Sequence, residues 1–335
     1  MGLLSPETYP VKISGTGSYV PSTVVSSVEL AAKCNSSPEW IYDKLGIHER
    51  RVAAANETTS DLAAEAARRA LSQAGIGADD LDLLIVATTT PDRLAPSTAA
   101  IVQRKLGGGK KYPAFDLAAA CSGFLYGLAV GAQFISTDTC RNVLLVGADT
   151  LTRVTDWNNR DCVYFGDGAG AAVLARSRPD YGLLAYELGA DGTGSELYTV
   201  PAGGAERPAT LDTVGSGAHF ARHDGRNILS FAVEVVPPTV RRVLDQAGVT
   251  ISDLDAVIPH QASMHTVRTL ANHLGVPLSK VTTILKNHGN TGAASLPMAL
   301  DDCNRRNGLR SGDLVLFMGL GAGMTWGAAV MRWDA

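Results

Sequence analysis

The apolar residues of this chain follow two alternating spacings. Longer segments repeat an apolar residue every three or four positions, as residues 263–274 do, which is typical of one buried face of a helix. Short continuous apolar runs lie between them, and such runs are typical of strands that are buried on both faces. These runs are residues 83–86, 142–148, 256–258 and 313–319. The alternation predicts an α/β fold with mixed sheets that carry helices on both faces.

Two stretches of the chain repeat each other. Residues 71–85 and 244–258 share Leu, Gln, Ala, Gly, Asp, Leu, Asp and Ile in register. Each copy is typical of a helix that ends at a glycine, followed by a short loop and a buried strand. A polar stretch at 176–180 separates the two copies. We therefore expect two similar halves, residues 1–177 and residues 178–335, with a cleft where they pack together.

Composition narrows the classes of protein to which the chain can belong. The net charge is −4 over 335 residues, which gives no signature of nucleic-acid or anionic-membrane binding. No apolar run approaches the roughly twenty residues needed to span a bilayer, and residues 1–7 lack the basic and apolar segments of a secretory signal. The five cysteines form no C-x-x-C pair, which argues against a disulfide framework or a zinc site. We expect a soluble cytoplasmic protein with no nucleic-acid or membrane partner.

Two glycine-rich runs could suggest nucleotide binding. Residues 166–170 are not spaced as G-x-G-x-x-G, and residues 107–111 lack the flanking pattern of a P-loop. We interpret the first run as a place of tight backbone packing and the second as a turn.

Cys121 is the first residue with candidate chemistry. It follows three alanines and precedes small and apolar residues that predict a buried helix. The thiol would then lie at a helix N-terminus, where the partial positive charge and free N–H groups favour a thiolate. A lone cysteine in apolar surroundings is more often an inert core residue, so a catalytic role depends on partners elsewhere in the chain.

Two polar residues in the second half could be those partners. His260 follows the repeated strand, at a strand end where α/β sheets place ligands and catalytic groups. Asn290 lies in a polar, glycine-bearing loop, residues 286–295. With Cys121 they predict a nucleophile and two hydrogen-bond donors. Papain-like proteases share the order Cys, His, Asn, but their C-G-x-C-W signature is absent here and the internal duplication is a different architecture.

Several motifs of the chain together resemble β-ketoacyl-acyl-carrier-protein synthase III of the thiolase superfamily. They are FDLAAACSGF at 115–124, FGDGAGA at 165–171, PHQA at 259–262, HGNT at 288–291 and GMTWG at 323–327. Segments at 39–41, 46–47 and 49–51 match as well, so the resemblance spans nearly the whole chain. It implies a thiolase-like duplicated αβαβα layered fold with two mixed five-stranded sheets, and a homodimer. Thiolase itself is not expected, because its second catalytic cysteine in a C-terminal C-x-G motif is absent.

The resemblance also implies a reaction, a decarboxylative Claisen condensation. An acyl-CoA would acylate Cys121, and a malonyl thioester on acyl carrier protein or CoA would then lose CO2 and attack the acyl group. The products would be a β-ketoacyl thioester, CoA and CO2. His260 Nε2 and Asn290 Nδ2 would donate to the enolate oxygen, and the N–H groups of Cys121 and Ala322 would form the oxyanion hole. No metal or cofactor is implied besides the CoA thioester substrate.

By the same resemblance, other residues would bind the substrates. Trp40 and Arg160 would enclose the adenine of CoA, and Lys44 would replace the arginine usual at its position, keeping the charge but losing the planar fork. Short-primer members carry a Phe at the position of Ala95, which reaches into the partner subunit's acyl pocket. Ala95 should therefore leave room for a longer or branched primer. Leu320 likewise replaces a Phe of the family.

The surface for the carrier protein departs from the family pattern. Relatives present Arg and Lys on the helix after the catalytic His and on a nearby strand. The corresponding positions here are His265, Asn272, His273 and Ser230. Three arginines could compensate: Arg241, Arg242 and Arg268. The sequence therefore does not decide whether an acidic carrier protein docks on this surface.

Three functions are compatible with these residues. The first is a condensing enzyme of fatty-acid initiation or of a specialised pathway. The second is an acyltransferase that moves an acyl group to an O, N or S acceptor without condensation. The third is a non-enzymatic partner of another ketosynthase. The sequence does not define the acyl primer or whether the second substrate is carried by protein or by CoA.

Overall fold

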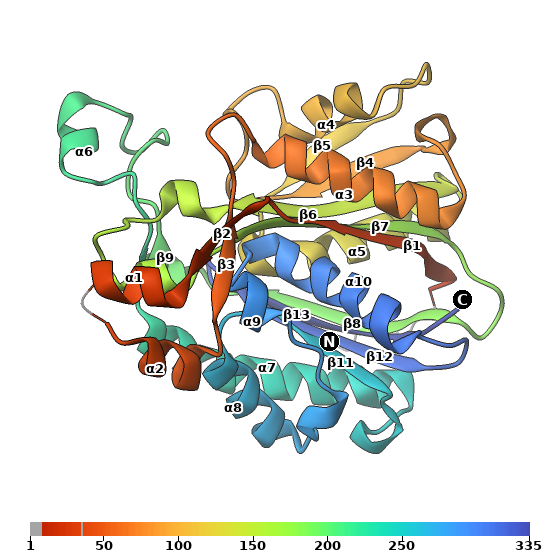
Figure 1. The fold of residues 1–335 in the computed structure, drawn as a ribbon. Coiled ribbons are helices and arrows are strands. Elements are labelled where there is room, and N and C mark those ends of the chain that lie inside the picture. The colour runs from red at the N-terminus through yellow and green to blue at the C-terminus, as the bar shows by residue number, and fades with distance from the viewer. Residues whose placement is uncertain (1–8, 35) are drawn as a thin grey trace.

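The structure is a computed structural model that describes residues 9–34 and 36–335. Residues 1–7, in which the sequence shows no secretory signal, lie outside this described part. Two mixed sheets lie face to face, with helices between them and helices on both outer faces (Figure 1). This order of layers confirms the expected αβαβα arrangement.

The first sheet is built from strands of the first half of the chain, in the order β1-β7-β6-β4-β5. β4 runs parallel to β5 and β6, whereas β7 runs antiparallel to β1 and β6. The sheet is therefore mixed, as predicted. Its strands are β1 (Val11–Tyr19), β4 (Leu83–Ala87), β5 (Ala114–Leu117), β6 (Asn142–Thr150) and β7 (Asp167–Arg176).

The second sheet takes its strands from the second half, in the order β11-β12-β13-β8. These strands are β8 (Gly182–Ala190), β11 (Ala256–Pro259), β12 (Leu314–Gly321) and β13 (Thr325–Arg332). Two small antiparallel ribbons lie outside the sheets. They are β2 (Thr23–Ser26) with β3 (Glu49–Val52), and β9 (Tyr198–Thr199) with β10 (Arg222–His223).

The second sheet has four strands in the described part of the chain, so the expectation of five was wrong. The segment that would supply the fifth strand meets β11 at a single parallel bridge, Val257 to Val281, with Thr282 N donating to the Val257 carbonyl at 2.9 Å. Beyond this bridge the backbone bonds to a side chain instead of a strand. Gln261 Nε2 donates to the Thr282 carbonyl at 3.3 Å, and Ile284 N donates to Gln261 Oε1 at 3.0 Å. The ladder ends because Gln261 takes its hydrogen bonds.

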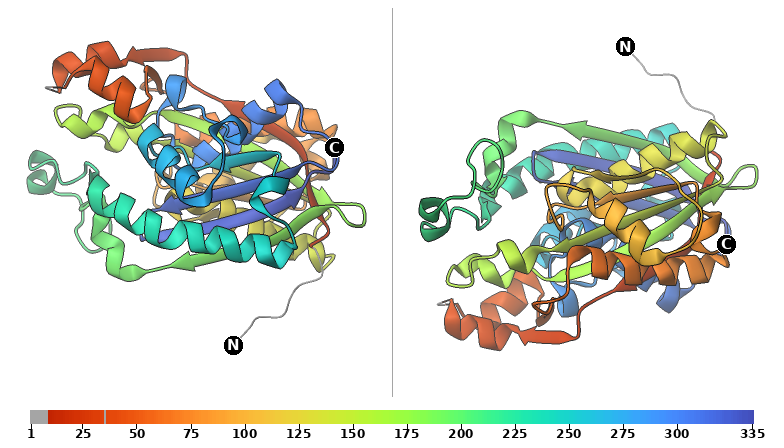
Figure 2. Two further views of the ribbon diagram at one scale, coloured as in Figure 1. Left: turned by 90° about the horizontal axis from the view of Figure 1, so that it is seen from below. Right: turned by 90° about the horizontal axis from the view of Figure 1, so that it is seen from above.

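The helices form three layers. α5 (Gly123–Ser136) and α10 (Ser295–Asn307) lie between the sheets. α3 (Thr59–Ala74) and α4 (Thr98–Leu106) cover the first sheet, and α7 (Gly225–Ala247) and α8 (Met264–Leu274) cover the second (Figure 2). The shorter helices are α1 (Ser27–Lys33), α2 (Pro38–Trp40), α6 (Leu211–Gly215) and α9 (Leu285–His288). Among the described residues, no helix has the length and apolar character to cross a membrane.

The predicted repeat and glycine roles are visible in this fold. α3 and α7 both end at a glycine with left-handed backbone, Gly75 at φ 70° and Gly248 at φ 66°. Gly170 on β7 lies so close to α10 that a Cβ there would be 2.5 Å from the backbone nitrogen of Met298. Gly107 forms a turn after α4 with φ 78°. The interpretation of the two glycine runs as tight packing and as a turn is therefore confirmed.

Candidate active site

Cys121 lies in a sharp turn between a strand and a helix. β5 ends at Leu117, and a single 3-10 turn (Ala120–Ser122) leads directly into α5. Ala120 has left-handed backbone at φ 46°, an uncommon conformation for a residue with a side chain. The turn places the thiol at the start of α5, as the sequence predicts, and leaves it partly exposed to a cavity.

The thiol is protonated in the resting protein. Burial raises the pKa of Cys121 to about 12, and the nearby carboxylate of Asp149 adds to the rise. The dipole of α5 opposes both effects. With a pKa of about 12 the group is a thiol near neutral pH, so nucleophilic attack requires the proton to be removed as the new bond forms.

Asp149 is a buried carboxylate that sequence reasoning missed. It lies at the end of β6, where Oδ1 accepts from Thr89 N at 2.8 Å and Oδ2 accepts from Ala293 N at 2.7 Å. Burial raises its pKa. Its bonds connect the loop after β4 to the segment after Asn290, so it holds two walls of the site together. The signal was a single aspartate closing an otherwise apolar strand.

His260 follows β11, and its ring is held by one hydroxyl. Nδ1 lies 2.7 Å from Ser295 Oγ, and the same oxygen accepts from Gln261 N at 3.4 Å. When the Ser295 hydroxyl donates to Nδ1 the ring proton lies on Nε2, and when it accepts from Nδ1 the ring proton lies on Nδ1. Burial lowers the pKa of His260 to about 4, so the ring is neutral near pH 7.

Asn290 is fixed by its backbone and by its amide oxygen. Its N–H donates to the Tyr164 carbonyl at 2.8 Å, and its carbonyl accepts from Gly166 N at 3.0 Å. Oδ1 accepts from Gly292 N at 2.9 Å. Since this bond engages the oxygen, the Nδ2 group of Asn290 is the free end of the amide.

The end of β12 packs directly on the cysteine turn. A Cβ on Gly321 would lie 2.8 Å from both the Ala119 carbonyl oxygen and the Cys121 nitrogen, so only glycine fits there. Ser122 Oγ and Thr325 Oγ1 lie 2.7 Å apart, and both reach the carbonyl of Ala119, at 2.8 and 3.0 Å. These contacts hold the segment that carries Ala322 against the cysteine turn, and Ala322 and Cys121 line the same cavity.

One cavity of about 340 Å³ joins most of the residues that the sequence singled out. Its lining includes Cys121, His260, Asn290, Ala322, Leu320, Trp40 and Lys44. The cavity lies between elements of the two halves, where the repeat led us to expect a cleft. No group of three or more His, Cys, Asp or Glu side chains in the described part of the chain is arranged to hold a metal ion.

Arg160 and Trp40 contact each other directly at the edge of this cavity. The Arg160 guanidinium carbon lies 4.1 Å from the centre of the Trp40 ring, a cation–π contact. Trp40 ends α2, and Arg160 begins the 3-10 turn Arg160–Val163. A purine held between them would have to separate the pair.

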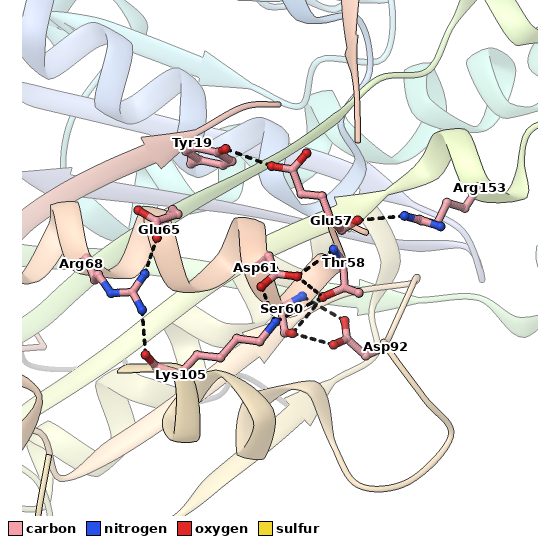
Figure 3. A network of polar contacts seen from close by, with 10 residues as sticks. All are labelled: Tyr19, Glu57, Thr58, Ser60, Asp61, Glu65, Arg68, Asp92, Lys105 and Arg153. Carbon is pink, nitrogen blue, oxygen red and sulfur yellow. Dashed lines mark hydrogen bonds and ion pairs between the residues drawn. The ribbon is translucent and has the colours of Figure 1, made fainter. Parts of the chain in front are cut away.

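Ala95 does not line the cavity. It is exposed, next to Leu94, whose side chain is 89% exposed. Figure 3 shows how the loop that carries it is attached to α3: Ser60 donates to Asp92 through its N–H at 2.9 Å and through its Oγ at 2.5 Å. The loop is thus anchored to α3 through Asp92, and its apolar residue Leu94 is exposed to solvent in the single chain.

Comparison with known proteins agrees with these motifs. A family described as 3-oxoacyl-[acyl-carrier-protein (ACP)] synthase III matches residues 115–192, and its C-terminal counterpart matches residues 244–333. A relative named beta-ketoacyl-[acyl-carrier-protein] synthase III, from Natranaerobius thermophilus, is 45% identical over 326 residues, which cover 96% of this chain and 99% of the relative.

Solved structures show the same fold. The 3-oxoacyl-[acyl-carrier-protein] synthase III of Aquifex aeolicus superposes on this chain with a TM-score of 0.88 at 39% sequence identity. The superposition covers 96% of this chain and 100% of the Aquifex chain. The priming beta-ketosynthase of the R1128 polyketide biosynthetic pathway superposes with a TM-score of 0.89 at 34% sequence identity. This superposition covers 100% of this chain and 99% of the ketosynthase chain.

Proposed function

The chain belongs to the 3-oxoacyl-[acyl-carrier-protein] synthase III family of acyltransferases, and on that basis we propose that Cys121, His260 and Asn290 carry out its condensation. Cys121 is the nucleophile, and His260 and Asn290 are the donors to an enolate. The observation that carries the assignment is that all three residues line one cavity. In that cavity the His260 ring is neutral, and its Nδ1 is hydrogen-bonded to Ser295.

The first step is acylation of the thiol. Cys121 Sγ attacks the carbonyl carbon of an acyl-CoA, the C–S bond to CoA breaks, and CoA leaves as its thiol with the proton of the cysteine. The neutral ring of His260 lines the same cavity and can relay that proton. The Ser295 hydroxyl can donate to or accept from Nδ1, so it supports either neutral form of the ring.

The second step is loss of CO2 from a malonyl thioester. The electron pair of the breaking C–C bond moves toward the thioester carbonyl and forms an enolate, whose oxygen accepts from His260 Nε2 and Asn290 Nδ2. Each well-placed donor of this kind contributes about 2.7–4 kcal/mol. The carbanion then attacks acyl-Cys121, and the tetrahedral oxyanion accepts from the N–H groups of Cys121 and Ala322. Collapse releases the β-ketoacyl thioester and the cysteine. We propose no metal or redox cofactor, since two thioesters and a thiol supply every bond that changes.

The substrates are an acyl-CoA and a malonyl group, for which we propose acyl carrier protein as the carrier because the relatives are named for it. Trp40 and Arg160 would separate to admit adenine, and Lys44 would face the phosphates. Of the three arginines that could receive the carrier, Arg242 forms a two-point ion pair with Glu187, with N–O distances of 2.9 and 2.6 Å.

The remaining proposals concern the assembly and the location of the protein. We propose a homodimer in the cytoplasm, in which the Ala95 loop of one subunit closes the acyl pocket of the other. Its anchorage to α3 and its exposed Leu94 support this role.

A transferase without condensation is the second candidate, but it is less well supported. Such an enzyme needs the thiol and a base. It has no use for a second donor such as Asn290, whose orientation here is fixed by three hydrogen bonds.

The test of the function measures acylation of the protein and release of CO2 separately. Incubation with an acyl-CoA should add one acyl mass to the intact protein, and Cys121→Ala should abolish the adduct. Cys140→Ala is the matched control, because Cys140 is buried away from the cavity lining. Addition of a carboxyl-labelled malonyl thioester should then release labelled CO2. Transfer of the acyl group to an acceptor without CO2 release would contradict condensation.

A further inference from the structure

Tyr198 brings a phenol into the cavity wall on a rigid support. It belongs to β9 and lies opposite His223 of β10 in the ribbon. Its ring packs edge-on against Phe165, with centroids 6.2 Å apart and planes at 76°. Held by the ribbon and by this ring, the hydroxyl has a fixed place in the cavity.

Two phenols line the cavity, and they belong to different ends of it. Burial raises the pKa of Tyr164, with Asp161 raising it further and Arg160 lowering it. Burial also raises the pKa of Tyr198, and Cys121 and Asp149 add to the rise. Tyr164 follows the Arg160–Val163 turn, and its N–H donates to the Asp161 carbonyl at 3.2 Å. The Tyr198 ring packs on Phe165, whose backbone pairs with Asn290. Tyr164 therefore belongs to the Arg160 edge, and Tyr198 lies against the segment that pairs with Asn290.

The Tyr198 hydroxyl has no hydrogen-bond partner among residues 9–34 and 36–335. Two other polar side chains of the lining are engaged: Thr89 Oγ1 donates to Asp149 Oδ1 at 2.9 Å, and His223 Nδ1 lies 3.2 Å from Asp161 Oδ2. Apolar side chains also line the cavity, and they offer no acceptor: Leu151, Phe165, Leu320 and Met324.

An unpartnered hydroxyl in the cavity that holds the nucleophile has a consequence for the acyl group. Water can solvate the phenol while the cavity is empty. An alkyl chain on Cys121 displaces that water and leaves the hydroxyl unpaired, which costs about 1–3 kcal/mol. An acyl chain with an oxygen in reach of the phenol restores the lost bond, so the two kinds of primer should be discriminated.

We propose that Tyr198 is a specificity-determining residue whose hydroxyl donates to an oxygen on the acyl chain carried by Cys121, so that hydroxyacyl or oxoacyl primers are preferred to alkyl primers of equal length. This inference rests on the proposed acylation of Cys121. Tyr198 selects the primer and takes no part in bond making.

The experiment measures the rate of Cys121 acylation with matched primers. Butyryl-CoA is compared with 3-hydroxybutyryl-CoA, and pentanoyl-CoA with 4-oxopentanoyl-CoA, at limiting concentration. Wild type should favour the oxygen-bearing member of at least one pair. Tyr198→Phe keeps the ring and removes the hydroxyl, and should reduce that preference about tenfold.

Tyr164→Phe is the matched control, because it removes the phenol at the Arg160 edge of the cavity. It should change both members of each pair by the same factor and leave the preference intact. An unchanged preference in Tyr198→Phe, an equal loss on both members, or no preference in wild type would overturn the inference. Failure of every acyl-CoA to acylate wild type would instead overturn the proposed function, and this inference with it.

Discussion

At the scale of single residues, His260 depends on a partner far away in the chain. Ser295 is separated from it by 35 positions, yet its hydroxyl is the one polar contact of Nδ1 among the described residues. Burial alone lowers the pKa of His260 to about 4. The neutral state of the ring is thus a consequence of where it lies, and the position of its proton depends on whether Ser295 donates or accepts.

Ser295→Ala tests this dependence. Without the hydroxyl no donor to Nδ1 favours the Nε2–H form that the proposed decarboxylation needs, so kcat for release of CO2 from a malonyl thioester should fall about tenfold, while KM changes little. Steady-state kinetics at pH 7 check the split. A rise in KM with unchanged kcat would show that Ser295 acts in binding instead.

At the scale of elements, β12 and the cysteine turn form one unit. The end of β12 lies against the backbone of the Ala120–Ser122 turn, and Ser122 and Thr325 join the two through the Ala119 carbonyl. The proposed oxyanion hole would therefore be made by two elements from opposite halves. Its geometry depends on Gly321, where the close approach of the two backbones leaves no room for a side chain.

Gly321→Ala should disrupt that unit. A Cβ would lie 2.8 Å from two backbone atoms, so the turn must move, and condensation should fall at least about a hundredfold. Gly319→Ala is the matched control on the same strand, since its nearest neighbours are side chains at 3.3–3.6 Å. Assays of CO2 release with both variants check this, and equal activities would refute the role of close packing.

At the scale of the whole molecule, burial shifts the pKa values of ionisable groups in both halves toward the neutral form. Burial lowers the pKa of His260 and of His288 to about 4, and it raises the pKa of Asp167 to about 6. A histidine whose pKa falls on folding stabilises the protein fully above its ordinary pKa of 6.5 and loses that contribution as the pH falls toward 4. A carboxylate with a raised pKa acts in the opposite direction.

His288→Gln isolates one histidine from these opposing groups. Between pH 7 and pH 5 the free energy of unfolding of wild type should fall relative to the variant, by up to about 2 kcal/mol, because the unfolded wild-type chain takes up a proton that the folded chain excludes. Urea denaturation at both pH values checks this. His273→Gln is the control for the loss of any imidazole, because His273 is exposed. If the free energy of unfolding of wild type and of His288→Gln changed with pH in parallel, the prediction would be contradicted.

The sequence predicted the layered fold, and it pointed to the proposed catalytic trio, because both depend on local features. Apolar runs and glycine-ended helices are properties of short segments, and Cys121, His260 and Asn290 each lie within a short motif at the end of an element. The number of strands in the second sheet did not follow from such features. Its fifth strand was lost to the side chain of Gln261, a competition for hydrogen bonds that only the folded chain reveals.

By itself, then, the sequence determined the layered fold and the family to which the chain belongs, and it predicted the residues that are proposed to react. The tertiary structure decided the protonation of Cys121 and His260, the contact between Trp40 and Arg160, and the presence of Tyr198 in the cavity that holds the thiol. Desolvation and cavity walls arise from residues far apart in the chain. No local pattern records them, since they exist only once the two halves exclude water from the space between them.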